Sequence, residues 1–429
     1  MKLPTDPYKG VRDFYPEDMA VQKKIFTIWR NVVEKYGYEE YNASVLEPAE
    51  LYRAKSGEEI VNEQTYTFVD RGEREVTLRP EITPTVARMV AAKKRELAFP
   101  LRWYSIPNLF RYEQPQRGRI REFWQLNVDI FGVDNLQAEV EVIQMAYEIT
   151  QAYGLKPTDF EIRINSRKVL NYITQDLFGL DFETSQKVLK LIDRKNKIAA
   201  DLFIKTAEEI LKDEKKSSQL ITLLNSKNFE EFTTNLKQTK EEHEGLKEIY
   251  TVMAALEKLG VTNVRFDQTL TRGADYYTGV IFEVFDNNPS NRRSVFGGGR
   301  YDDLLSLFGG EKVSAVGFGA GDVVAEDLME TYGAISETEA VADIYICPMN
   351  DTVTDYAQDL AQKIREKNIR VAVDYSQRKV GDQIKTADRK KIPYIIVIGE
   401  EEVKTGEFKL KNLATGDQQV TTIETLKLS

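Results

Sequence analysis

Histidine and cysteine are almost absent from this chain, which has one of each among 429 residues. A single cysteine, Cys347, cannot form an internal disulfide, so the disulfide-stabilised secreted classes are excluded. The one histidine, His243, lies in the charged run KEEHEGLKE and is expected at the surface. Neither a zinc cluster nor a Ser-His-Asp triad can be built from it, and we expect no fixed metal site. Chemistry here must use Arg, Glu, Asp, Gln, Tyr and backbone groups, which favours phosphoryl or adenylyl transfer.

Long apolar runs and a basic surplus are also missing. No run approaches the roughly 18 residues that a membrane span needs, and the start, MKLPTDPYKGVRDFYPED, lacks the apolar centre of a secretory signal. We therefore expect no membrane partner and a cytoplasmic location. Net charge is −10, which argues mildly against a general nucleic-acid binder. Residues 361–391 nevertheless hold ten Lys and Arg against four Asp and Glu. This run is either a local RNA-binding surface or a solvated helix face.

The order of sequence patterns predicts two domains and an insertion. Mixed helix and strand signals run from 1 to 330 and are interrupted at 166–259 by Lys-, Glu- and Leu-rich sequence with helical periodicity. A small, polar segment at 331–342 is expected to be a linker. Residues 343–429 alternate strand and helix and predict a separate α/β unit. The elements expected within these regions are a helix at 17–36, a strand at Tyr41–Val45, a hairpin at 64–79, and strands at 343–348, 370–374 and 394–398.

The most informative stretch is Leu101–Gly132. From Arg121 to Ile130 apolar residues alternate with Phe123, Gln125, Asn127 and Asp129, which predicts a strand with one core face and one polar face. The loop before it holds four arginines against one acid, Glu113, and arginine suits bidentate phosphate recognition. Those arginines are Arg111, Arg117, Arg119 and Arg121. A solvated hairpin would explain the loop but not the polar strand face.

These segments resemble the histidyl-tRNA synthetases, a family of class II aminoacyl-tRNA synthetases. FRYE with its arginine loop resembles motif 2, and TLRPEITPTVAR (77–88) resembles the family's LRPE segment. LTRGADYYTGVIFEVF (270–285) is similar to the histidine-specific RGxDYY motif, and FGGGRYDDL (296–304) to the family's GGGRYD turn. SAVGFGAGD (314–322) resembles motif 3. The resemblance covers nearly the whole chain. It implies an α+β fold, in which an antiparallel sheet with flanking helices carries a helical insertion and an α/β anticodon-binding domain, and it implies a homodimer.

By this resemblance the chain activates L-histidine with ATP and transfers it to its tRNA. Glu81 and Thr83 would hold the amino group, and Gln125 and Asp129 would complete a pocket for imidazole. Tyr276 and Tyr277 would line its side, although one of the two could equally be a core aromatic. Arg111 and Arg272 would act at the α-phosphate as catalytic groups that also touch the amino acid. The ATP contacts implied are Arg111, Glu113, Arg119 and Phe123, with Mg²⁺ on the pyrophosphate side.

Two features leave alternatives open. Motif 3 in the family ends in an arginine that meets ATP, and Val324 stands at that position; either other arginines such as Arg117 or Arg119 compensate, or activation is lost. The glycines at 297–299 and at 317, 319 and 321 fit close approach to a ligand or turns that need positive φ.

The C-terminal region resembles the family's anticodon-binding domain. The tRNA contacts it suggests are Lys379, Lys385, Arg389 and Lys390, together with Lys391 and with Tyr375 and Tyr394 for base stacking. The competing interpretations are a non-catalytic relative, such as the regulatory subunit of ATP phosphoribosyltransferase, and an RNA sensor that has lost catalysis. An intact RGxDYY motif, the insertion and the C-terminal region argue against both.

Overall fold

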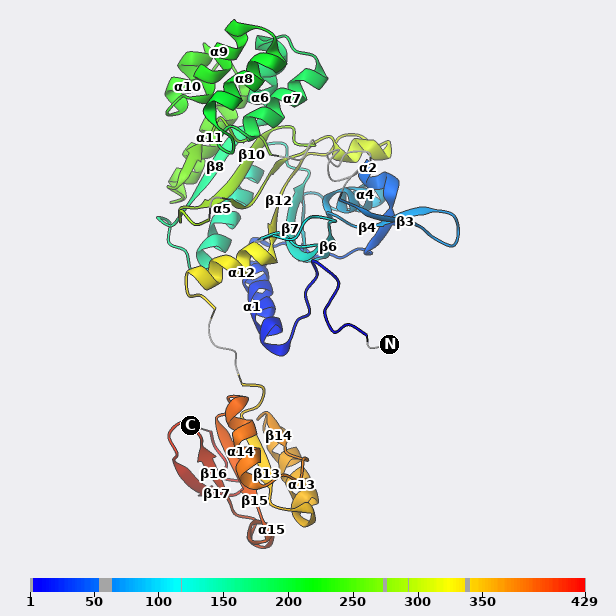
Figure 1. Ribbon diagram of the computed structural model, residues 1–429, viewed down its shortest axis with the longest axis vertical. Helices are drawn as coiled ribbons and strands as arrows, with labels where there is room; N and C mark the ends of the chain where they lie inside the picture. The colour runs from blue at the N-terminus through cyan, green and yellow to red at the C-terminus, as the bar shows by residue number, and fades with distance from the viewer. Residues whose placement is uncertain are drawn as a thin grey trace. The chain divides into compact units, whose positions relative to one another are not determined.

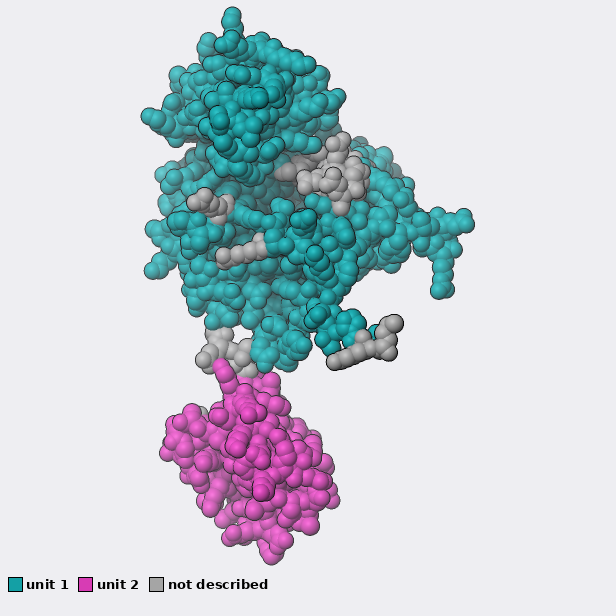
Figure 2. Space-filling model, in the orientation of Figure 1, with its two compact units in different colours: residues 1–336 teal, residues 337–429 magenta. Residues whose placement is uncertain are grey.

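The computed structural model describes residues 3–53, 64–116, 118–272, 276–291, 293–335 and 340–428. The chain divides into two compact units, Met1–Ser336 and Glu337–Ser429 (Figures 1 and 2). Within the described ranges, no helix is both long and apolar enough to cross a membrane.

Unit 1 is built on a nine-stranded sheet in the order β1-β5-β7-β12-β11-β10-β8-β9, with β6 paired to β7. The pairs β1–β5 and β8–β9 at the two ends are parallel, and the pairs between them are antiparallel. The predicted α+β fold with a central antiparallel sheet is confirmed. The strands are β1 (Glu39–Glu40), β5 (Leu101–Ser105), β6 (Asn108–Phe110), β7 (Glu122–Phe131), β8 (Phe160–Ser166), β9 (Val264–Phe266), β10 (Val280–Asp286), β11 (Ser294–Arg300) and β12 (Ala315–Gly321).

Helices cover the apolar face of this sheet. α1 (Pro16–Val33) contacts α5 (Gln137–Ala152) and α12 (Asp322–Thr331), and both of these contact the sheet (Figure 1). Trp29 of α1 is fully buried there and donates a hydrogen bond from its indole to the Tyr153 hydroxyl. Because the apolar residues of β7 point into this core, its alternate residues must face the other way. The short helices beside these elements are η1 (Glu34–Tyr36) and η3 (Leu304–Phe308).

A smaller three-stranded sheet joins β2 (Leu46–Pro48), β4 (Glu75–Leu78) and β3 (Tyr66–Val69) in that order, with α2 (Ala49–Arg53) and α4 (Thr83–Lys93) beside it. The predicted strand at Tyr41–Val45 is wrong, because strands lie before and after it. Arg79 explains why no strand forms there, because its guanidinium donates hydrogen bonds to the Ala43 carbonyl (2.7 Å) and the Ser44 carbonyl (3.3 Å). A buried side chain therefore satisfies backbone groups that a strand ladder would use.

The region 166–259 folds as a helical module whose last helix returns along β8 and β9 (Figure 1). Its helices are α6 (Arg167–Asn171), η2 (Tyr172–Leu177), α7 (Phe182–Asp193), α8 (Ala200–Leu211), α9 (Glu214–Leu224), α10 (Phe229–Leu236) and α11 (Glu244–Lys258). His243 is half-buried, which corrects the expectation of a surface residue. It caps α11 by accepting a hydrogen bond from the Leu246 amide (3.4 Å) and packs on the Tyr172 ring. Burial lowers the pKa of His243.

Unit 2 is a five-stranded sheet in the order β14-β13-β15-β16-β17. β13 is parallel to both β14 and β15, as the sequence alternation predicts, whereas β16 and β17 add an antiparallel edge that it did not predict. The elements are β13 (Ile344–Pro348), η4 (Asp351–Val353), α13 (Thr354–Arg365), β14 (Val371–Val373), α14 (Val380–Arg389), β15 (Tyr394–Ile398), α15 (Glu400–Thr405), β16 (Phe408–Asn412) and β17 (Gln418–Thr421). Cys347 is buried within β13, and burial raises its pKa to about 12.

Candidate active site

Glycines from two adjacent strands face each other on the polar face of the central sheet. Gly297 and Gly299 in β11 lie opposite Gly319 and Gly317 in β12. A Cβ at Gly299 would lie 2.6 Å from the Val280 carbonyl oxygen, so the strands leave no space for a side chain there. None of these four glycines has a positive φ. Turns that need positive φ therefore do not explain these four glycines, and the close approach seen here is that of neighbouring strands and side chains. We call these four residues the glycine floor.

Polar side chains of β7 lie against one edge of the glycine floor. Asp129 pairs in register with Gly317, and Asn127 pairs with Gly319. A Cβ at Gly319 would lie 1.9 Å from Nε2 of Gln125, and one at Gly317 would lie 2.3 Å from Oδ1 of Asp129. The side chains therefore occupy the space that the glycines vacate. The prediction that Gln125, Asn127 and Asp129 share a polar face away from the core is confirmed by this register.

Asp129 has an almost fully buried carboxyl group, of which one oxygen is hydrogen-bonded and the other has no partner among the described residues. The Tyr301 hydroxyl donates to its Oδ1, while Oδ2 has no hydrogen-bond partner among the described residues. Burial raises the pKa of Asp129 to about 7, against the opposing effect of the Tyr301 bond. Tyr301 belongs to the GGGRYD turn, but the sequence patterns assigned it no role. Its place two residues after the last of the three glycines was the available signal.

We expect Asp129 to contribute stability to unit 1 that is lost as pH rises from about 4 to 8, and Asp129→Asn to remove that contribution. The pKa of Asp129 is about 7 in the folded chain and 3.8 ordinarily. The stability that protonation of Asp129 contributes is therefore complete below pH 3.8 and is lost as pH rises through 7. Urea midpoints read by tryptophan fluorescence report on unit 1, where all three tryptophans lie. Asp201→Asn on the surface of α8 is the control. An equal midpoint difference between wild type and Asp129→Asn at pH 5 and pH 8 would contradict the assignment.

Glu81 and Thr83 lie at the beginning of α4 and face the tyrosines of the RGADYY segment. The Tyr276 hydroxyl donates to Oε2 of Glu81 (3.3 Å), and Tyr52 donates to the Glu81 carbonyl (3.2 Å). Burial and the Glu81 charge raise the pKa of Tyr276, against a hydrogen bond with Thr83. The rings of Tyr276 and Tyr277 lie 5.1 Å apart. Both tyrosines are buried, yet both hydroxyls make polar contacts, so neither is purely a core residue.

Arg272 lies at the opposite edge of the floor from Gln125. Its φ of 56° is left-handed, which a non-glycine residue rarely adopts. The guanidinium donates to Glu283 (2.7 Å), to the Gly297 carbonyl (3.0 Å) and to the Tyr277 hydroxyl (3.3 Å). Burial lowers its pKa, but the charges of Tyr277 and Glu283 outweigh burial and raise it. Its buried Nε has no partner among the described residues.

A chain of contacts connects Arg272 to Arg111. Nε of Arg111 donates to the Pro80 carbonyl (2.9 Å), Pro80 precedes Glu81, and Glu81 accepts from Tyr276. The Tyr276 ring in turn packs on Tyr277, which accepts from Arg272. The Arg111 guanidinium also lies 5.3 Å from the centre of the Phe123 ring. Both predicted catalytic arginines thus belong to one polar cluster.

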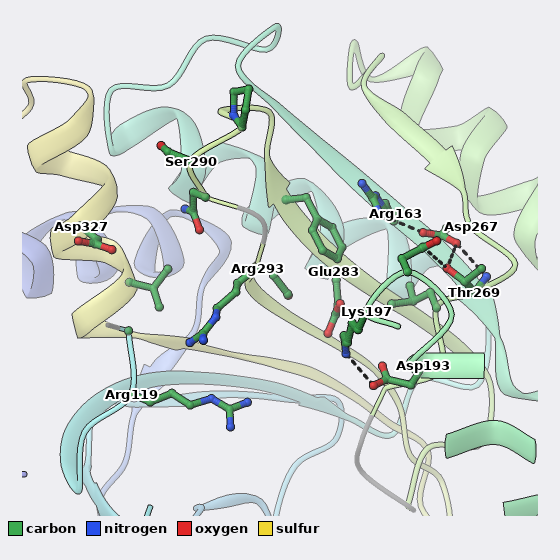
Figure 3. Close-up of a pocket in the computed structure, with 18 of the residues that line it drawn as sticks. Arg119, Arg163, Asp193, Lys197, Asp267, Thr269, Glu283, Ser290, Arg293 and Asp327 are labelled. Atoms are coloured by element: carbon green, nitrogen blue, oxygen red, sulfur yellow. Dashed lines mark hydrogen bonds and ion pairs between the residues drawn. The ribbon is translucent and has the colours of Figure 1, made fainter. Parts of the chain in front are cut away.

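An open cleft of about 830 Å³ adjoins the floor at Glu283 and is lined by the motif 2 loop, β10, the residues after it, and α12 (Figure 3). Arg119 and Val324 both line this cleft. Arg119 is 56% exposed and lies 3.8 Å from Glu113, which is a loose ion pair. Arg117, and residues 273–275 of the RGADYY segment, lie outside the described residues.

The basic residues expected to contact tRNA lie on and beside α14 in unit 2. Lys379, Lys385, Arg389 and Lys390 are all exposed, and Lys385 pairs with Asp382 (3.2 Å). Exposed Tyr375 remains open to base stacking. Tyr394 does not, because β15 carries its ring into the core, where it is 8% exposed. The expectation that both tyrosines stack on bases is wrong for Tyr394.

Comparison with known proteins finds similarity to histidyl-tRNA synthetases along nearly the whole chain. The family profile described as "Histidyl-tRNA synthetase" matches residues 10–321, and "Anticodon binding domain" matches 343–427. A histidine–tRNA ligase of Leptospira biflexa is 40% identical over 97% of this chain and 95% of its own length. One from Thermoplasma volcanium is 35% identical over 97% and 96%. In fold, the crystal structure of histidyl-tRNA synthetase from Nostoc sp. PCC 7120 superposes with a TM-score of 0.81, covering 99% of this chain and 98% of that one at 23% identity. The chain belongs to the histidyl-tRNA synthetase family.

Proposed function

We propose that this chain activates L-histidine with ATP to histidyl-adenylate and pyrophosphate and then transfers histidine to the 3′ end of its tRNA. One observation carries the proposal. The glycine floor is bounded on one side by Oδ2 of Asp129 and on the other by Nε of Arg272, and neither atom has a hydrogen-bond partner in the described part of the chain. A surface with an acceptor at one edge and a guanidinium at the other suits a ligand that joins an imidazole to a phosphate-bound carboxyl group.

The amino acid would lie between β7 and the start of α4. Glu81 is the carboxylate for the ammonium group, with Thr83 beside it, because a cation in a buried site needs a negative partner. Asp129 and Gln125 would bond the two imidazole nitrogens, which require a matched donor and acceptor. Tyr276 and Tyr277 would form the wall between the amino group and Arg272. The 3.3 Å bond from Tyr276 to Glu81 already orients that carboxylate.

In the first step one carboxylate oxygen of histidine attacks the α-phosphorus. The bond from phosphorus to the bridging oxygen breaks, and pyrophosphate leaves with the electron pair. Charge grows on the nonbridging oxygens, so guanidiniums fixed at that point stabilise the transition state more than the ground state. Arg111 and Arg272 are the groups that we assign there. In the second step a terminal hydroxyl of tRNA attacks the carbonyl carbon and AMP leaves.

ATP would enter through the open cleft. Phe123 offers a ring for the adenine, Glu113 an acceptor, and Arg119 a charge for the outer phosphates. Mg²⁺ would accompany those phosphates. Within the described ranges no group of three or more His, Cys, Asp and Glu side chains is placed to hold a metal ion, so we assign its ligands to ATP itself.

We expect Arg119→Ala to raise the KM for ATP about tenfold with a small effect on kcat, since one charge-assisted bond to phosphate is lost. Its loose 3.8 Å pair with Glu113 leaves the guanidinium able to turn toward a ligand. Initial rates over a range of ATP concentrations at saturating histidine measure this effect. An unchanged ATP affinity would remove Arg119 from the site.

Histidine-dependent exchange of labelled pyrophosphate into ATP tests the proposal as a whole. Exchange needs histidine, ATP and no tRNA, so it isolates the first step. A purified chain without exchange would instead fit the non-catalytic relatives. We further propose that the chain works as a cytoplasmic homodimer and that Lys379, Lys385, Arg389 and Lys390 contact tRNA phosphates. Affinity for tRNA should then fall steeply with salt concentration.

A further inference from the structure

Val324 leaves the outer phosphates of ATP without the guanidinium that the family pattern supplies from this position. It lies in the first turn of α12 on the wall of the open cleft. Gly118 of the motif 2 loop faces it, since a Cβ there would lie 3.8 Å from Cγ2 of Val324. A short apolar side chain opposite a glycine leaves room, but it provides no charge.

Two arginines near α12 are already committed to protein partners. Arg12 pairs with Asp322 (2.6 Å) and with Glu326 (3.2 Å), which fastens the N-terminal segment to α12. Arg121 donates to the Glu113 carbonyl (3.1 Å) and to the Tyr8 hydroxyl (2.9 Å), and its guanidinium lies 4.1 Å from the centre of the Tyr112 ring. Neither arginine lines the cleft.

Cations in the half of the cleft that faces the helical module are also matched by acids. Arg163 pairs with Asp267 (3.2 Å), and Lys197 pairs with Asp193 (2.7 Å). Each of these cations has an acid as its partner, although the Lys197 pair is exposed on both sides.

Arg293 and Arg119 are the described arginines that line the cleft on the same side as Val324, and Figure 3 shows both side chains directed into the shared space. Arg293 directly precedes β11, the strand that carries Gly297 and Gly299 of the glycine floor. Its Nη2 donates to Oε1 of Gln116 (3.0 Å), which brings it to the tip of the motif 2 loop. Gln116 and Arg119 form a closed turn through two backbone hydrogen bonds of 2.9 and 2.8 Å.

We propose that Arg293, together with Arg119, binds the β- and γ-phosphates of ATP and replaces the guanidinium that Val324 lacks. This rests on the proposed function. An exposed bond to a neutral amide oxygen exchanges readily for a bond to an anion, because charge-assisted bonds to phosphate are the stronger kind. The motif 2 loop and the β10–β11 connection would then close on ATP from two sides.

The test is Arg293→Ala in the full chain, measured by ATP–pyrophosphate exchange without tRNA. The KM for ATP should rise about ten- to a hundredfold, while the KM for histidine stays within about twofold. Arg265→Ala, an exposed arginine on β9 outside the cleft, is the matched control and should change neither. The double variant Arg293→Ala with Val324→Arg should recover most of the ATP affinity.

Each outcome has a distinct meaning. Normal exchange with slow transfer to tRNA would overturn the proposal and assign Arg293 to the RNA end. A raised KM for ATP that Val324→Arg leaves uncorrected would overturn the replacement idea. If wild type shows no exchange, the proposed function fails; calorimetric binding of a nonhydrolysable ATP analogue to wild type and Arg293→Ala then decides the inference separately, with equal affinities overturning it.

Discussion

Arg272→Ala should lower the rate constant for adenylate formation about 100- to 1,000-fold, the usual effect of removing one donor that meets charge in a transition state. The Nη1 and Nη2 nitrogens of Arg272 are fixed by Glu283 and the Gly297 carbonyl, and its buried Nε has no partner among the described residues. A donor held in place needs no reorganisation when charge develops. Single-turnover formation of adenylate at saturating histidine and ATP measures the effect directly.

Backbone strain does not complicate this substitution. Alanine and arginine are disfavoured alike at a φ of 56°, so the change removes the guanidinium without relieving the chain. Arg272→Lys restores charge but not the planar fork, and we expect it to recover only part of the rate. A variant with normal single-turnover rate, or one whose defect lies in KM for histidine alone, would show that Arg272 is not at the reacting phosphate.

Arg300→Ala should destabilise unit 1 by about 3–5 kcal/mol, the cost of leaving a buried charge without its partner. Two nitrogens of Arg300 donate to the two carboxylate oxygens of Glu139 at 2.6 and 2.7 Å. These side chains are 6% and 2% exposed. The same guanidinium also donates to the Val133 and Asn135 carbonyls, both at 3.1 Å. Arg300 ends β11, so its loss should also loosen the glycine floor.

Urea unfolding read by tryptophan fluorescence measures this loss. Lys187→Ala is the control, because its pair with Glu183 on α7 is exposed on both sides and should leave the midpoint unchanged. Replacing both partners, with Arg300→Met and Glu139→Leu, should be much less harmful than Arg300→Ala, since no buried charge is then orphaned. Equal losses in the single and the double variant would contradict the charge argument.

The β7 strand shows how much a sequence pattern can predict. Strict alternation over ten residues determines which side chains share a face, so the polar role of Gln125 and Asp129 follows from the order of residues alone. The strands at 344–348 and 394–398 are equally predictable from the sequence, because they are continuous apolar runs. A chain of contacts through Glu81, Tyr276 and Tyr277 connects Arg111 with Arg272, and no local sequence pattern reveals that connection.

What could not be predicted depends on contacts between distant residues. The partner of Arg272 is Glu283, which lies eleven residues away in β10, and sequence patterns do not show which charges pair at that separation. The segment 41–45 has the composition of a strand, yet two of its carbonyl groups accept hydrogen bonds from Arg79. Tyr394 lies in a basic, polar neighbourhood of the sequence, but its position at the start of β15 buries it. Tertiary context decided each of these cases.

A floor without side chains has no rotamers to lose. Elsewhere each long side chain that a ligand immobilises costs roughly 0.5–1.5 kcal/mol in conformational entropy, whereas Gly297, Gly299, Gly317 and Gly319 are already held by the strand ladder before anything binds. The ordering cost of catalysis is therefore confined to the walls. Selection acting on substrate choice could change the wall residues one at a time while the surface beneath them stayed the same.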